Sequence, residues 1–212
     1  MGRVSRGAVA ALVLATIAGA GVARAVPSAA NSHVPSHILL VGRSGGLADT
    51  SSGAFTVVVH DAANVPVAGS VVEVRILNCP GARLSAQAYD PGSSIRCGTT
   101  GVLRTTDAHG EVRITLVGGG TAGGPAGAGP CVQVFATGVP LGSASLAYLD
   151  LDGAGGMGSQ DISLWLTDVG SGEDIGRSDY DGSGTLGAND LSLWLTLWGT
   201  GGSAESAASY CP

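Results

Sequence analysis

The chain contains the same loop-and-helix pattern twice, and this repeat limits the possible folds more than any other feature of the sequence. In the second copy, residues 179–190, side chains with oxygen atoms stand at loop positions 1, 3, 5 and 12, and glycine stands at position 6. Calcium-binding loops order their ligands in this way, with a backbone carbonyl at position 7 and a bidentate carboxylate at position 12. The predicted ligands are Asp179, Asp181, Ser183, the carbonyl of Thr185, and Asp190.

The first copy, residues 150–161, begins 29 residues earlier and offers fewer ligands. Position 5 is Ala154, so we expect this site to bind calcium more weakly. The segments after the two loops, Ile-Ser-Leu-Trp-Leu-Thr and Leu-Ser-Leu-Trp-Leu-Thr, also match. A duplicated structural unit explains this match, whereas a chance acidic turn does not. The predicted ligands in this copy are Asp150, Asp152, the carbonyl of Gly156, and Asp161.

Two loop–helix units with aspartate at position 12 resemble a dockerin module, over about residues 149–200. Residues 143–149, before the first loop, alternate as a strand does, so an EF-hand with two flanking helices fits badly. The resemblance implies a calcium-dependent module that docks onto cohesin domains and helps to assemble extracellular complexes, often on enzymes that degrade polysaccharides.

The same resemblance implies where a partner would bind. Dockerins recognise their partner through loop positions 10 and 11. In this chain these positions are Ser159 and Gln160 in the first copy and Ala188 and Asn189 in the second. Dockerins also commonly carry basic residues on the helix after the loop. This chain has leucine and threonine at those places, namely Leu166, Thr167, Leu195 and Thr196. A cohesin domain is therefore the expected kind of partner, but not one of the well-studied cellulosomal type.

The N-terminus predicts a secretory signal peptide. Arg3 and Arg6 precede an apolar run over residues 7–22, and Ala23-Arg24-Ala25 has the Ala-x-Ala form of a cleavage site. The alternative, an uncleaved anchor, is weaker because this run is shorter than the roughly 20 residues that span a bilayer. We expect cleavage after Ala25, no membrane insertion afterwards, and an extracellular or cell-surface location on a bacterium.

Charge is distributed unevenly along the chain. Residues 26–149 carry six acidic residues and six arginines, whereas residues 150–212 carry ten acidic residues and one arginine, a formal charge of −9. A segment with this charge repels itself, and divalent cations relieve the repulsion. The chain has no lysine and no basic patch, which argues against nucleic acid as a partner.

Four cysteines in an exported chain predict two disulfides. Sequence alone permits three pairings of Cys79, Cys97, Cys131 and Cys211. We favour Cys79–Cys97, which would close a local excursion between two strands, and therefore Cys131–Cys211. A metal–thiolate site is the weaker alternative because the chain has no Cys-x-x-Cys pattern.

Residues 26–36 read as a linker, and from residue 37 the chain reads as short strands between turns. About seven such strands favour an antiparallel β-sandwich. The expected strands include residues 54–60, 70–77, 101–105, 111–117, 132–137 and 143–149.

Residues 37–149 resemble a bacterial Ig-like domain of the kind repeated in invasin-type surface proteins. The resemblance rests on residues 59–61 and 66–72, followed by residues 105–112. It implies a spacer or adhesive unit, not a catalyst. The cysteine-containing insertion at residues 78–98 departs from the simplest form of this domain.

The sequence shows no pattern typical of an active site. Glu73 and Glu111 could form a glycosidase pair, but two strand carboxylates each followed by Val-Arg are more simply solvated charges. A glycan-binding face would need aromatic side chains, and the β-region has few. They are Phe55, Tyr89, Phe135 and Tyr148.

The aromatic side chains of the repeat have a structural interpretation. Trp165, Trp194 and Trp198 recur at helical spacing with Leu191 and Leu195, which predicts a packed core. Three leucines fall outside this stripe and should contact either a partner or the β-region. They are Leu164, Leu193 and Leu197.

The sequence thus predicts a mainly β protein. An Ig-like β-sandwich over residues 37–149 precedes a small α-helical calcium module over residues 150–200 and a tail over residues 201–212. We expect a non-catalytic protein for attachment or assembly. The alternative is an accessory, glycan-binding subunit of a polysaccharide-degrading complex.

Overall fold

The computed structural model of the chain describes residues 25–122, 124–125 and 129–212. The predicted signal peptide, residues 1–25, lies outside the described residues except for Ala25. Within the described ranges, no helix is both long and apolar enough to cross a membrane.

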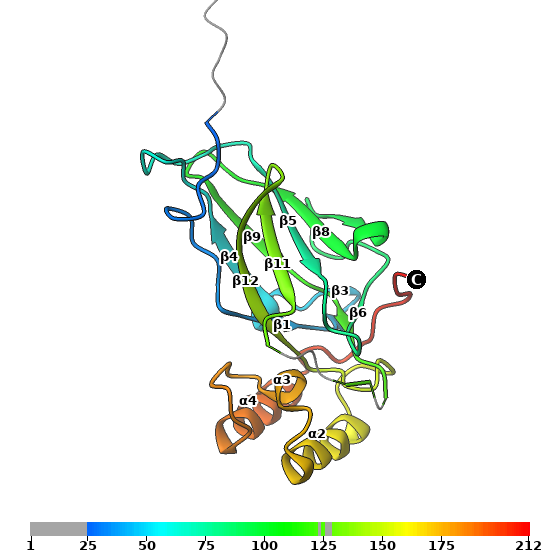
Figure 1. Ribbon diagram of the computed structural model, residues 1–212. Helices are drawn as coiled ribbons and strands as arrows, with labels where there is room; N and C mark the ends of the chain where they lie inside the picture. The colour runs from blue at the N-terminus through cyan, green and yellow to red at the C-terminus, as the bar shows by residue number, and fades with distance from the viewer. Residues whose placement is uncertain (1–24, 123, 126–128) are drawn as a thin grey trace, which may run out of the picture.

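The protein is mainly β, with one large curled sheet (Figure 1). This sheet has six strands in the order β1-β12-β11-β5-β8-β7. β1 and β12 pair in parallel, and the other neighbours are antiparallel. The strands are β1 His37–Leu40, β5 Val71–Ile76, β7 Ser94–Arg96, β8 Gly101–Thr105, β11 Val132–Ala136 and β12 Val139–Tyr148.

A second, two-stranded sheet pairs β4 (Ala54–Val58) with β9 (Glu111–Thr115). In β9, Val112 and Ile114 are buried while Glu111 and Arg113 are exposed, so the strand presents an apolar face to the interior. These buried residues and those of the six-stranded sheet form one hydrophobic cluster. Two short pairs complete the β-structure, β2 Arg43–Ser44 with β3 Leu47–Ala48, and β6 Arg83–Leu84 with β10 Gly118–Gly119.

Each of the six predicted strand segments overlaps a strand of the structure. The largest difference is at β12, which begins at Val139 and not at residue 143. A tight turn at Thr137 and Gly138, both with positive φ (48° and 85°), leads directly from β11 into β12. This turn places the first residues of β12 beside β11, where their backbone groups can pair.

Both predicted loops lead into helices at the lower end of Figure 1. Each long helix is preceded by a glycine whose backbone N–H donates to an aspartate three residues later, Gly158 to Asp161 (2.7 Å) and Gly187 to Asp190 (2.9 Å). Such caps stabilise helix starts, where negative charge is also favourable. The helices are α2 Ser159–Ser171, α3 Ile175–Ser178 and α4 Ala188–Gly199, with the short α1 Thr50–Gly53 and the 3-10 helix η1 Cys97–Thr99 elsewhere.

The helical segment packs on the β-region. α3 lies against β12, and a side chain at Gly182 would place its Cβ 2.7 Å from Cγ of His37 in β1. Trp165 and Trp194 are 4% and 1% exposed and belong to the same hydrophobic cluster as the sheets. The helices and the β-region therefore share a core.

The predicted core role is wrong for two residues of α4. Trp198 is 53% exposed and Leu195 is 47% exposed. Leu164, Leu193 and Leu197 instead pack against the core as half-buried side chains. On α4 the buried face thus includes Leu193 and Leu197, which lie beside His37, Ile38 and Phe55 of the β-region.

Both predicted disulfide pairings are wrong. The structure joins Cys79 to Cys131 and Cys97 to Cys211, with Cα–Cα distances of 5.4 and 5.0 Å. Cys79 follows β5 and Cys131 precedes β11, and the pairing of these strands brings the two cysteines together. Strand pairing, not closeness in sequence, decides the partner.

The two segments expected to be a linker and a tail make specific contacts. In residues 26–36, backbone groups of His33 and Val58 exchange two hydrogen bonds (2.8 and 3.0 Å). In residues 201–212, which we call the C-terminal tail, Glu205 pairs with Arg43 and Tyr210 pairs with Ser85. The tail therefore runs along the β-region.

Candidate metal centre

The second loop, residues 179–190, connects α3 to α4 and gathers three carboxylates. Oxygen atoms of Asp179, Asp181 and Asp190 lie within 4.8 Å of one another. Asp179 and Asp190 are buried and Asp181 is exposed. The loop backbone holds them, because the N–H of Asp181 donates to Asp190 (3.1 Å) and the N–H of Ser183 donates to Asp179 (3.0 Å) and Asp181 (2.9 Å).

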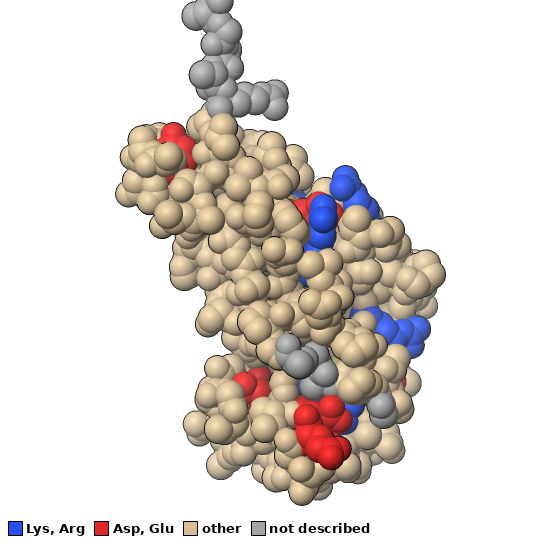
Figure 2. Space-filling view, viewed as in Figure 1, with Lys and Arg blue, Asp and Glu red and all other residues tan. Residues whose placement is uncertain are grey.

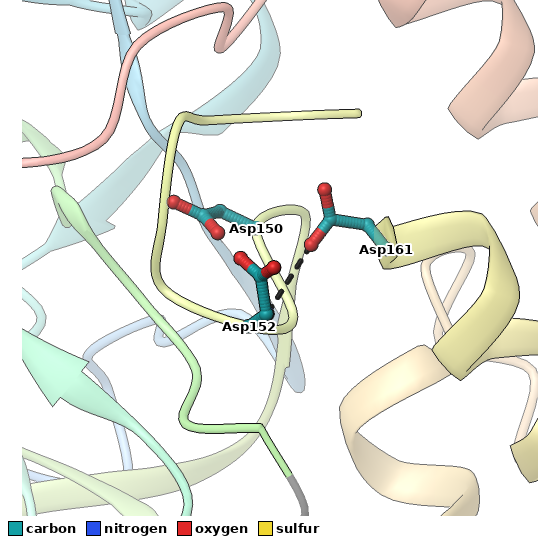
Figure 3. Close-up of side chains that lie close together, drawn as sticks. All are labelled: Asp150, Asp152 and Asp161. Atoms are coloured by element: carbon teal, nitrogen blue, oxygen red, sulfur yellow. Dashed lines mark hydrogen bonds between the residues drawn. The ribbon is translucent and has the colours of Figure 1, made fainter. Parts of the chain in front are cut away.

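The first loop, residues 150–161, repeats this arrangement (Figure 3). Oxygen atoms of Asp150, Asp152 and Asp161 also lie within 4.8 Å of one another. The N–H of Asp152 donates to Asp161 (3.2 Å), and the N–H of Ala154 donates to Asp150 (3.0 Å) and Asp152 (2.8 Å). These bonds match those of the second loop position by position. The duplication seen in the sequence is therefore also a duplication of geometry.

The acidic side chains of these loops have little positive charge beside them. Figure 2 shows acidic side chains on the helical end of the molecule, while the arginines in view lie mainly over the β-region. Arg177 is buried and forms an ion pair with Asp168 (2.6 Å). Among the described residues, no arginine lies within ion-pair distance of the six loop aspartates. Each loop thus concentrates negative charge that a cation would neutralise.

Burial makes this charge costly in the first loop. Burial raises the pKa of Asp161 to about 6, and the charges of Asp150 and Asp152 act in the same direction. Burial also raises the pKa of Asp150, to which the neighbouring Asp152 contributes. The negative charge of these carboxylates is therefore unfavourable unless a cation or a proton neutralises it.

The donor atoms suit a hard cation. Both triads consist of carboxylates, with no imidazole or thiolate among them. In the second loop the hydroxyl of Ser183 lies 3.1 Å from the carbonyl oxygen of Thr185, so the donors predicted at positions 5 and 7 are adjacent. An all-oxygen set of this kind fits divalent cations such as Ca²⁺. The two triads can hold a metal ion.

One residue near the first triad was not predicted from the sequence. The hydroxyl of Ser206, in the C-terminal tail, donates to Oδ2 of Asp150 (2.6 Å) and accepts from the N–H of Gly156 (2.7 Å). Ala154 indicated that a donor was missing from this loop. No sequence pattern indicated that a residue of the tail would lie there.

Four of the six residues expected to contact a partner lie on the outside of the helices, whereas Leu164 and Leu193 pack against the core. Ser159, Gln160, Ala188 and Asn189 are exposed in the first turns of α2 and α4. The repeat also presents an apolar pair on each helix, with all four side chains 44–57% exposed. We call these residues the apolar helix face: Leu166 and Val169 on α2, and Leu195 and Trp198 on α4.

Comparisons of the chain with protein-family models, with curated proteins and with solved structures found no match.

Proposed function

We propose that this protein is a secreted, non-catalytic calcium-binding protein that attaches to a partner protein through a dockerin-like module over residues 150–200. The proposal is carried by one observation. Two loops of the same chain hold matching triads of carboxylates, and each leads directly into a capped helix. In this proposal the β-region is an Ig-like sandwich that serves as a spacer or adhesive unit.

Calcium is the proposed ion because of the ligand order. Positions 1, 3, 5, 7 and 12 of the second loop supply oxygen atoms only, and the loop is long enough for a large, flexible coordination shell. Mg²⁺ demands a smaller octahedral shell and keeps several of its waters, which suits this set less well.

The apolar helix face is the proposed contact surface. Exposed apolar patches mark protein–protein contact sites, and tryptophan is enriched among the residues that contribute most of the binding energy. Ser159, Gln160, Ala188 and Asn189 lie at the starts of the same helices and would provide polar contacts. A cohesin domain is the partner that the dockerin resemblance implies.

The alternative, an accessory glycan-binding subunit, has less support. Tyr148 is buried, and arginines cover the rings of Tyr89 and Phe135, with guanidinium-to-centroid distances of 5.0 and 4.4 Å. Sugar binding requires open aromatic faces, and Phe55, the fourth ring of the β-region, packs against the core.

Titration calorimetry tests the calcium assignment. We expect two calcium ions per chain, with weaker binding of magnesium. Asp190→Asn should weaken one site, because it removes charge from the bidentate position. Absence of heat at millimolar calcium, where even weak extracellular modules are occupied, would contradict the proposal.

A pull-down with cohesin domains tests the partner. Capture should require calcium and should be lost in Leu195→Asp, whereas Leu47→Asp, at a leucine on β3 that is also exposed, should leave it unchanged. Capture on a glycan array without capture by any cohesin would favour the alternative.

A further inference from the structure

The two loops differ at position 5. In the second loop, position 5 is Ser183, and its hydroxyl accepts a hydrogen bond from the position-7 N–H of Thr185 (3.4 Å). In the first loop, position 5 is Ala154, which has no hydroxyl. The first loop therefore lacks both a donor for the ion and an acceptor for its own position-7 N–H.

The C-terminal tail supplies a hydroxyl at this place. The position-7 N–H of the first loop belongs to Gly156, and it donates to the hydroxyl of Ser206 at 2.7 Å. The same hydroxyl lies 2.6 Å from Oδ2 of Asp150, the position-1 carboxylate. A serine 50 residues away in sequence thus binds the same backbone group that Ser183 binds within its own loop.

The first loop is shaped to admit the tail. Gly156 has φ of +75°, and a Cβ there would lie 2.5 Å from backbone atoms of Ala204 and Glu205. The N–H of Met157 donates to the carbonyl of Ser203 (2.9 Å). The second loop has Thr185 in place of Gly156, so only the first copy has a position 7 without a side chain.

The β-region fixes the position of the tail. A disulfide joins Cys211 to Cys97, and Nε of Arg43 donates to the carbonyl of Ser206 (2.7 Å). Arg43 also forms an ion pair with Glu205 (3.2 Å). The serine hydroxyl is therefore held in place by contacts outside the loop, which lowers the entropic cost of using it as a ligand.

We propose that Ser206 replaces the missing position-5 ligand, so that the tail completes the first calcium site. This inference rests on the proposed calcium function of the two loops. It makes the first site a joint product of the helical module and the tail. Calcium bound there would fasten the tail, and through it the β-region, to the first loop.

Calorimetric calcium titration of the whole mature chain tests the inference. Ser206→Ala should weaken one of the two sites about tenfold, as loss of a ligand or of its direct support does, and should leave the other unchanged. Ser183→Ala should weaken the other site. Ser209→Ala, a serine of the same tail whose side chain is exposed, is the matched control and should change neither site.

A rescue variant separates ligation from general stability. Ala154→Ser in the Ser206→Ala background returns a hydroxyl to position 5 from within the loop and should restore most of the lost affinity. Ser206→Thr keeps the hydroxyl and should bind nearly as well as the unsubstituted chain. A merely structural serine would lower the melting temperature equally in calcium and in chelator, with no rescue by Ala154→Ser.

The outcomes distinguish this inference from the proposed function. Two-site binding in which Ser206→Ala behaves like Ser209→Ala would overturn the role of Ser206 and leave the calcium function standing. Absence of calcium binding by the unsubstituted chain would overturn both.

Discussion

Asp161 illustrates, at the scale of one residue, why a bound cation would stabilise the first loop. Its carboxyl group is buried at the start of α2, and its pKa is raised to about 6 mainly by that burial. The backbone N–H groups of Asp152 and Gly158 oppose the shift by donating to it. A bound divalent cation stabilises the charged form of this carboxyl group. Without metal, a proton can neutralise it instead.

The raised pKa predicts how stability changes with pH in chelator. Between about pH 4 and pH 6, the folded state retains a proton on Asp161 that the unfolded state has lost, so stability falls as the pH rises through this range. We therefore expect Asp161 to raise the melting temperature of the metal-free chain at pH 5 relative to pH 7, against an opposite contribution from His37, whose pKa is lowered by burial. Asp161→Asn should reduce this difference, and Glu111→Gln, an exposed control on β9, should not.

In saturating calcium the same change of pH should act in the opposite direction, because protons compete with the ion for Asp161. Circular dichroism melting curves at the two pH values, with and without calcium, measure both effects. A metal-free pH dependence of the melting temperature that Asp161→Asn leaves unchanged would contradict this account of the loop.

At the scale of secondary-structure elements, the copies of the repeat have diverged where they meet the rest of the protein. Asp168 on α2 corresponds to Leu197 on α4. Asp168 binds the guanidinium of Arg177 in α3 (2.6 and 2.8 Å) and the hydroxyl of Ser178 (2.5 Å). Leu197 instead packs against the shared core. The aspartate thus links α2 to α3, whereas the leucine at the corresponding position packs α4 against the β-region.

Breaking this buried ion pair should destabilise the helical segment. Asp168→Ala leaves Arg177 buried without its main partner, which costs about 3 kcal/mol in comparable pairs. Glu173→Ala removes an exposed acid from the same segment and should change the free energy of unfolding little. Urea denaturation of the two variants in calcium measures the difference. Equal stability would mean that the Asp168–Arg177 pair contributes nothing net.

Local patterns in the sequence were sufficient to predict these elements but not their partners. The alternation around Val112 and Ile114 predicted a strand, and the spacing from Asp179 to Asp190 predicted a loop followed by a helix. Both depend on residues close in sequence. The roles of Ser206 and Trp198 depend on which segment covers which face, and that is decided by packing between distant parts of the chain.

At the scale of the whole molecule, the C-terminal tail connects the β-region to the first loop. Cys211 is bonded to Cys97 beside β7, Ala207 packs with Ala48 and Val117, and Ser206 contacts the first loop. The pairing favoured from the sequence, Cys79–Cys97 with Cys131–Cys211, would instead have bonded this tail to the residue that precedes β11. A disulfide that closes so long a loop stabilises by roughly 4–5 kcal/mol in the chain-entropy model.

Tryptic mapping without reduction tests this connectivity. The chain has no lysine, so trypsin cleaves only after the arginines. Each cysteine then lies in a different peptide, and these peptides are residues 76–83, 97–104, 114–177 and 178–212. We expect two linked pairs, 76–83 with 114–177 and 97–104 with 178–212. A link between 76–83 and 97–104 would contradict the arrangement of the tail.

The central claim is that calcium holds the helical module together, and circular dichroism in calcium and in chelator tests it most directly. Calcium at a hundredfold excess over Kd adds about 2.7 kcal/mol per site, a large share of the stability of so small a helical segment. We predict that chelator removes much of the helical signal while the disulfide-linked β-region stays folded, and that Asp190→Ala does the same in calcium. A helical signal and a melting temperature unchanged by chelator would show that packing alone stabilises the module, and would contradict a stabilising role of calcium.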